Sequence, residues 1–310
     1  MGGLCLMGRI CNEWKVIKQV NTALVPLLIL LFFASLASVV SYIILLLAGD
    51  ILSMRKLVSK AAQIFLLFSI FPLRHYLKLT WADIGFAKRA IFFKQLGQGM
   101  LLGLFTLLPV MVTLYVMDIS VIDQTREWTS AAVVKRASLA LLLATLIAFG
   151  EEPIFSGILL AGLRKNMATG FAVLITACYY SAFHFVKTKT DIPYNELTPM
   201  SGFKLMAEAF ANVLNPEILS AFIALLVVGI FLATIRTEVA NGIGICIGCH
   251  ATWVWQIKLG KDYFNTNPDS DYYYLVSAYY DGVVGYLVAA WLSLLLVGYF
   301  IWKSYKKWAV

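Results

Sequence analysis

Charged residues are scarce in this chain of 310 residues. Asp, Glu, Lys and Arg make up 14% of it, hydrophobic residues make up 61%, and the mean hydropathy is +0.81. A soluble domain carries roughly 25% charged residues, so this sequence has too little polar surface to cover a water-soluble particle. Its basic residues give a net charge of +8 but form no basic block, which argues against nucleic acid as a partner. The composition therefore predicts an integral membrane protein whose first partner is the lipid bilayer.

Cysteine and histidine are also few. The five cysteines include one CxxC pair, Cys246 and Cys249, but a zinc or redox site of this type needs a second pair, which the sequence lacks. We expect this pair to pack as small residues between helices. The sequence has three histidines and no HExxH motif, so we predict no metal and no cofactor. Zinc held by two His and two Glu is the less favoured alternative.

Eight apolar stretches predict membrane-spanning helices, because a span needs about 20 predominantly apolar residues. They lie near residues 22–48, 57–73, 93–117, 137–163, 167–186, 217–235, 239–258 and 282–302. The first has no small-residue cleavage site, so we interpret it as a span rather than a signal peptide. The predicted fold class is all-α: a polytopic membrane helix bundle of about eight transmembrane helices, forming a single membrane domain over residues 1–310.

The segments between the predicted spans indicate where the chain leaves the bilayer. Residues 74–92 resemble an interfacial segment, and residues 187–216, which contain prolines and a glycine, predict a folded loop outside the membrane. The tyrosine-rich loop 258–281 is typical of an aromatic belt at the headgroups, with a substrate-docking surface as the second interpretation. A modest bias of Lys and Arg places both termini in the cytoplasm, and we expect a multi-pass protein of a bacterial inner membrane.

Four ionisable residues lie within predicted spans, where such groups are costly and mark functional sites. Glu151 and Glu152 interrupt the fourth span, His184 lies near the end of the fifth, and His250 lies in the middle of the seventh. At a rise of about 1.5 Å per residue, counted from basic residues at the inner ends of these spans, their heights agree within about 8 Å. We therefore predict that three helices bring these groups together. The alternative is that these groups pair only to stabilise the helix bundle. We favour it less, because apolar packing usually stabilises a bundle equally well.

The two neighbouring glutamates need a local distortion if both are to face one site. Adjacent side chains on a regular helix point about 100° apart. Pro153 lacks an N–H and disfavours the α region for the residue before it, so we expect it to push Glu152 out of the α conformation, with Gly150 adding freedom.

The residue types suit water activation. A carboxylate beside an imidazole in a low-dielectric cavity can accept a proton from water, and a second imidazole can donate to a forming oxyanion. On the fifth span Tyr180 lies one turn before His184, on the same face. On the seventh, Gly244 and Gly248 allow another helix to approach closely next to His250. The pattern predicts a metal-free hydrolase site.

Three motifs resemble those of a known family. The segment GEEPIFSG (150–157) resembles the first signature, EExxxR, of the CAAX-processing and bacteriocin-processing (CPBP, or Abi) glutamic-type intramembrane proteases. YSAFH (180–184) is similar to the second signature, and HATWV (250–254) resembles the third. The resemblance covers roughly residues 75–258, which would form the protease core. It implies a metal-free endopeptidase in an eight-helix bundle.

The resemblance also implies roles for the four ionisable residues. Glu151 would be the base that activates water, assisted by His184, with Glu152 as its partner, and His250 would stabilise the oxyanion. The substrate would be a membrane-embedded peptide or protein, lipidated or anchored at its C-terminus. In the eukaryotic branch of the family it is a prenylated protein that loses a C-terminal tripeptide.

Two positions depart from the family pattern. Ser156 stands where Arg is expected and cannot supply a fixed positive charge. Val254 stands where Asn is expected, which leaves His250 as oxyanion donor unless Thr252 or a backbone group helps. We expect Tyr180 and Thr252 to contact the substrate. The alternative function is a non-catalytic membrane binding or immunity module that retains the protease fold; a proton-coupled transporter is disfavoured because no internal repeat is evident.

Overall fold

The computed structural model describes residues 2–50 and 52–308, and the side chains of residues 17–50 and 52–307. It is 77% helical, with two three-residue strands, which confirms the predicted all-α class. Its contacts divide the chain into two compact units, each assembled from three separate segments. The predicted single membrane domain and its core at residues 75–258 stay predictions.

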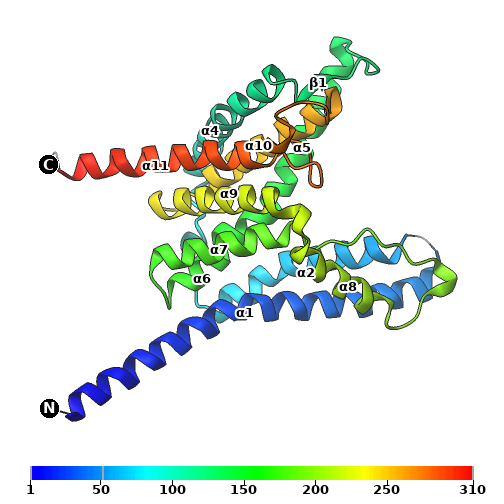
Figure 1. The fold of residues 1–310 in the computed structure, drawn as a ribbon. Helices are drawn as coiled ribbons and strands as arrows, with labels where there is room; N and C mark the ends of the chain where they lie inside the picture. Colours follow the sequence, from blue (N-terminus) through cyan, green and yellow to red (C-terminus); the bar gives the residue numbers. More distant parts are fainter. Residues whose placement is uncertain (1, 51, 309–310) are drawn as a thin grey trace. The chain divides into compact units, whose positions relative to one another are not determined.

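The first unit contains the chain up to Leu79 together with residues 158–175 and 185–214. Its helices are α1 (Gly2–Ala48), α2 (Met54–Tyr76), α6 (Leu160–Arg164), the beginning of α7 (Thr169–Phe183), α8 (Ser201–Ala211) and the 3-10 turns Tyr194–Glu196 and Asn212–Leu214. The helix α1 packs against α2 and α8 (Figure 1). Around Met54 and Leu205 these helices enclose a small apolar core. The predicted outer loop 187–216 thus contains a helix, α8.

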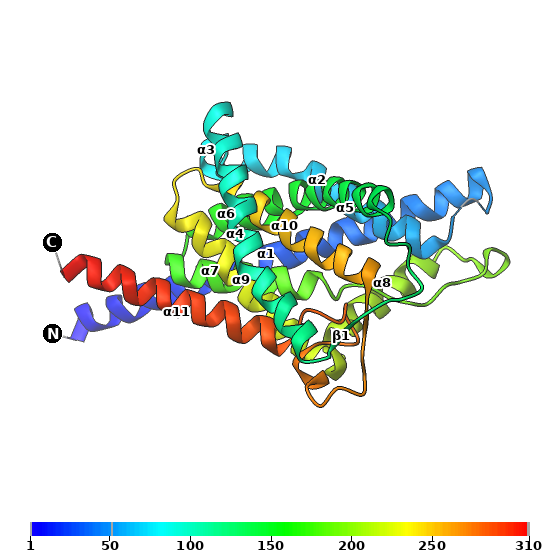
Figure 2. The same ribbon diagram turned by 90° about the horizontal axis from the view of Figure 1, so that it is seen from above.

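The second unit contains residues 80–157, residues 176–184 and the chain from Asn215 onward. Its elements are α3 (Trp81–Ile84), α4 (Arg89–Val116), β1 (Ser120–Ile122), α5 (Ser130–Glu152), most of a π-helical segment (Pro153–Leu159), the end of α7, α9 (Leu219–Glu238), α10 (Ile243–Tyr263), β2 (Phe264–Thr266), α11 (Tyr286–Trp308) and the 3-10 turns Pro216–Ile218 and Tyr273–Leu275. The helix α10 lies along α4 and α5, and α9 lies beside α11 (Figures 1 and 2). The strands β1 and β2 pair antiparallel, with Ser120 opposite Thr266.

Close contact between α4 and α10 depends on glycine. A methyl group at Gly244 would lie 2.9 Å from the carbonyl oxygen of Phe92, and one at Gly248 would overlap the carbonyl oxygen of Leu96. On the α4 side, a methyl group at Gly103 would lie 2.6 Å from the carbonyl oxygen of Cys249. The prediction that this face of α10 admits another helix is confirmed, and the contact fixes α10 in the region of His250.

Each of the eight predicted spans overlaps a helix, but the count of eight is not confirmed. Among the described residues, six helices are long and apolar enough to cross a membrane. They are Ile17–Ala48, Met54–Tyr76, Trp81–Val116, Ser130–Arg164, Pro216–Glu238 and Tyr286–Lys307. The helix α7 is apolar but has 15 residues, and α10 carries Lys258, Lys261 and Asp262 in its last two turns.

Candidate active site

The first motif lies where α5 changes its winding. Glu151 and Glu152 are the last two residues of α5, and residues Pro153–Leu159 continue as a π-helix. The expectation that Pro153 displaces Glu152 from the helix was wrong, because the wider winding begins at the proline itself, whose φ of −62° and ψ of −27° are helical. A π-helical turn accommodates a residue that cannot donate a backbone hydrogen bond without breaking the helix.

Glu152 is fully buried and joins the first motif to the third. Its Oε1 lies 2.8 Å from Nδ1 of His250, and its Oε2 accepts a 2.6 Å hydrogen bond from the hydroxyl of Ser156. Ser156, which replaces the family's arginine, therefore still contacts the glutamate, as a neutral donor instead of a positive charge. Both carboxylate oxygens of Glu152 thus have a hydrogen-bond partner, and the contact at Nδ1 fixes the orientation of the His250 ring.

Glu151 points elsewhere, toward both imidazole rings. Its Oε2 lies 3.7 Å from Nε2 of His184 and 3.9 Å from Nε2 of His250. These separations exceed a direct hydrogen bond, and Oε2 makes no hydrogen bond within the part of the chain that the structure describes. The prediction that three helices bring these groups together is thus confirmed: they come from α5, from α10 and from the turn that directly follows α7. Glu152 therefore contacts Nδ1 of His250, whereas Glu151 faces Nε2 of the same ring.

The tautomer of His184 follows from its hydrogen bond. Its Nδ1 lies 2.7 Å from the carbonyl oxygen of Tyr180, one turn earlier on α7. A carbonyl oxygen only accepts, so Nδ1 carries a proton, and in the neutral ring Nε2 is left as an acceptor. The ring of Tyr180 packs against His184, with centroids 4.7 Å apart, and lies 6.1 Å from the ring of His250.

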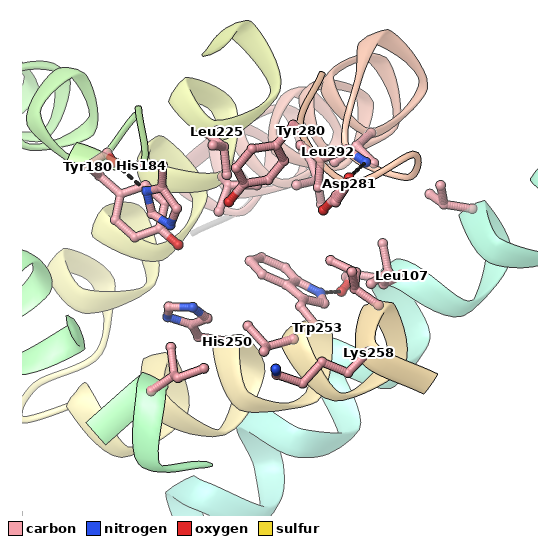
Figure 3. A pocket seen from close by; sticks show the side chains of 18 of the residues that line it. Leu107, Tyr180, His184, Leu225, His250, Trp253, Lys258, Tyr280, Asp281 and Leu292 are labelled. Atoms are coloured by element: carbon pink, nitrogen blue, oxygen red, sulfur yellow. Dashed lines mark hydrogen bonds between the residues drawn. The ribbon is translucent and has the colours of Figure 1, made fainter. Parts of the chain in front are cut away.

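A cavity of about 380 Å³ opens in front of these groups. Figure 3 shows Tyr180, His184 and His250 at one end of it, with the hydroxyl of Tyr180 directed toward the His250 side. Most of its other walls are apolar. They are formed by Leu107, Val110, Ile147, Leu225, Val228, Trp253, Val254, Ile257, Val284, Val288 and Leu292. This volume is in the range of small-ligand sites.

Thr252 does not join the other predicted site residues. Its hydroxyl donates to the carbonyl oxygen of Gly248 on its own helix, 2.9 Å away, and its side chain is buried outside the cavity lining, facing Gly103 on α4. Val254 does line the cavity, so the position where the family carries Asn presents a methyl surface.

The sequence analysis missed several lining residues, of which Tyr280 is the most informative. It lies in the tyrosine-rich loop 258–281, and its ring is 6.4 Å from that of His184. Burial, with smaller contributions from Asp281 and Glu151, raises the pKa of its hydroxyl, which therefore remains protonated at neutral pH. The second interpretation of that loop, a surface that meets the substrate, was the available signal. Lys258 and Lys261 also line the cavity. Their spacing from His250 places them on the same helix face, which could have predicted this position.

The cysteine pair lies apart from this site. Cys246 and Cys249 are both buried and unbonded to each other, and Sγ of Cys246 contacts the carbonyl oxygen of Leu232 at 3.4 Å. Within the described residues, no group of three or more His, Cys, Asp or Glu side chains is arranged to hold a metal ion. The predicted absence of a metal and of a cofactor stays a prediction.

The apolar helices and the meeting of Glu151, His184 and His250 beside a cavity are what a membrane-embedded hydrolase would need. Residues 134–256, which include all three motifs, match the family model described as type II CAAX prenyl endopeptidase Rce1-like. The match confirms the resemblance drawn from the motifs: this segment of the chain is similar to the CAAX-type prenyl endopeptidases. Searches of curated proteins and of solved structures each found no match.

Proposed function

We propose that the protein is a glutamic-type intramembrane endopeptidase, in which Glu151 activates a water that hydrolyses a peptide bond of a membrane-associated protein or peptide. One observation carries the proposal. A carboxylate oxygen without a hydrogen-bond partner faces two imidazole Nε2 atoms at 3.7 and 3.9 Å, at the end of an apolar cavity. A buried polar atom left without a partner in a native fold calls for an explanation, and a reactive water is one.

The separation between Glu151 and His184 suits one bridging water. A polar separation beyond a direct hydrogen bond is commonly bridged in this way. The water would donate one proton to Oε2 of Glu151 and the other to Nε2 of His184, because both are acceptors when the carboxylate is ionised and the ring neutral. The lone pairs of the water oxygen then face the cavity. As that oxygen bonds to the scissile carbonyl carbon, Glu151 takes a proton; it returns this proton to the leaving nitrogen as the C–N bond breaks.

His250 and Tyr180 would stabilise the oxyanion. With Nδ1 bound to the Glu152 carboxylate, a ring protonated on both nitrogens has its counter-charge in place, and its Nε2–H can donate toward the cavity. The hydroxyl of Tyr180 is a second donor at the same end of the cavity (Figure 3). It would serve as the second oxyanion donor, a role that the apolar side chain of Val254 cannot fill.

The cavity walls favour an apolar substrate. The matched family is described as a prenyl endopeptidase of CAAX sequences, and a lipidated or C-terminally anchored peptide fits walls made mostly of aliphatic side chains and one indole.

The proposal is tested by comparing the termini of membrane proteins in cells that carry the native chain, Glu151→Gln or the control Glu217→Gln. Glu217 is exposed on a 3-10 turn of the same unit, outside the cavity lining. We expect new C-termini with the native chain and the control, and none with Glu151→Gln, although all three proteins insert in equal amounts. Identical termini in all three strains would favour the non-catalytic module.

A further inference from the structure

The cavity is polar at both of its ends and apolar between them. One face of α10 runs along it, because its lining residues recur at three- and four-residue intervals. They are His250, Trp253, Val254, Ile257, Lys258 and Lys261. From the reacting end, the face passes from an imidazole over apolar side chains to two ammonium groups.

The middle of this face presents no free polar group. The indole N–H of Trp253 donates to the hydroxyl of Thr106 on α4 at 2.8 Å, so the indole offers the cavity a hydrocarbon surface (Figure 3). Val254 and Ile257 complete this section from α10, and Leu107 and Val110 contribute from α4. A peptide lying here would contact aliphatic and aromatic carbon.

The two lysines are not used by the fold. Neither forms an ion pair within the described residues. Lys258 is half-buried, and Figure 3 shows its side chain lying back along α10 with its nitrogen on the side of His250. A lysine that only escapes the membrane would extend toward the end of its helix. Lys258 instead directs its charge into the cavity.

Besides Glu151 at the reacting end, one other acidic residue of the described chain lines the cavity. Asp281 lines the cavity, but its Oδ1 accepts the backbone N–H groups of Val283 and Val284 at 2.9 and 2.7 Å. Figure 3 places it on the wall opposite Lys258. The lysine end therefore remains the place in this cavity where an anion finds donors.

We infer that Lys258 and Lys261 bind the free C-terminal carboxylate of the peptide substrate, and so set the distance between the cleaved bond and the C-terminus. This inference rests on the proposed function. Lys258 follows His250 by eight residues, a rise of about 12 Å along the helix. An extended peptide advances about 3.3–3.6 Å per residue. Because the Lys258 side chain lies back toward His250, at most about three or four residues lie between the cleaved carbonyl and a carboxylate bound there, and these residues face the apolar section.

The test compares two farnesylated, internally quenched peptides ending in two aliphatic residues and a serine, one with a free carboxylate and one with a C-terminal amide. We expect the native chain to cleave the acid with a kcat/KM at least about tenfold higher than the amide, mainly through KM. Lys258→Met/Lys261→Met should reduce this preference to about twofold or less, by lowering kcat/KM for the acid. Lys258→Arg should retain the preference. Lys94→Met, which removes an exposed lysine of α4 outside the cavity, is the control.

A binding measurement separates this inference from the proposed function. Glu151→Gln protein cannot cleave, so its affinity for the acid and amide peptides reports the lysine site alone. An equal affinity of this protein for both peptides, or an acid preference that survives the double lysine substitution, overturns the inference even if the native chain is a protease. An acid preference lost with the lysines supports it, whereas an absence of cleavage by the native chain contradicts only the proposed function.

Discussion

Ser156 offers a sharp test of how the site is held together. Its hydroxyl donates to Oε2 of Glu152 at 2.6 Å, and that carboxylate, with no exposed surface, binds Nδ1 of His250 through its other oxygen. Ser156→Ala removes one atom from a buried position and leaves Oε2 without its donor. A hydrogen bond to a charged group contributes about 1.5–3 kcal/mol, so we expect the free energy of unfolding to fall by about this amount.

The same substitution should also reduce activity. With one fewer anchor, the carboxylate of Glu152 can turn, and His250 turns with it. Misplacement of a reacting group by about 1 Å can cost about 100-fold, so we expect kcat to fall about 10- to 100-fold with little change in KM. Thermal unfolding in detergent micelles measures the first effect, and cleavage of the quenched farnesylated acid peptide measures the second.

A double-mutant cycle separates this hydrogen bond from a general effect of the substitution. In a Glu152→Gln background, the side chain at position 152 carries no charge, and the loss of the Ser156 hydroxyl should then destabilise the protein much less. We expect a coupling energy of about 1 kcal/mol or more between the two positions. Strict additivity, or a Ser156→Ala protein as stable and as active as the native one, would refute the reasoning.

Three further results are expected. His184→Ala should lower kcat/KM about 10²- to 10⁴-fold without preventing insertion, because it removes the second acceptor of the bridging water; near-native activity would exclude this role. Gly248→Ala should destabilise the protein by about 1–3 kcal/mol in thermal unfolding, because its methyl group overlaps a backbone carbonyl of α4, whereas Gly298→Ala on α11, with open space around it, should not. Hydrogen bonds from Thr125 lower the pKa of Asp123 below its ordinary 3.8. The contribution of Asp123 to stability is therefore complete above pH 3.8 and is lost as the pH falls through the lowered pKa. Asp123→Asn should remove this loss of thermal stability at acid pH, and an unchanged pH profile would contradict the prediction.

The fold class and the meeting of the ionisable groups were predictable because they depend on regular geometry. Apolar stretches locate helices, and a constant rise per residue converts sequence distance into height. Glu151, His184 and His250 could therefore be placed in one layer before any contact was known. The glycines of α10 were likewise readable, because only small residues allow two helix backbones to approach so closely.

Other features depend on contacts that no local pattern contains. The contact of Glu152 with Nδ1 of His250 depends on how α5 packs against α10. Tyr280 reaches the cavity from a loop whose path depends on tertiary contacts. Thr252 was placed by its distance from His250 in the sequence alone, whereas its position on the helix turns it toward α4.

The buried pair of Glu152 and His250 also constrains how the protein is made. The two residues are 98 positions apart in the sequence, so α5 enters the membrane during synthesis well before the ribosome has produced α10. A charged side chain at the centre of a bilayer costs about 2.5–3.5 kcal/mol on insertion scales, and α5 carries two. Until α10 arrives, α5 must keep its carboxylates protonated or remain beside the insertion machinery. The arrival of α10, which brings His250 to the carboxylate of Glu152, removes part of this cost.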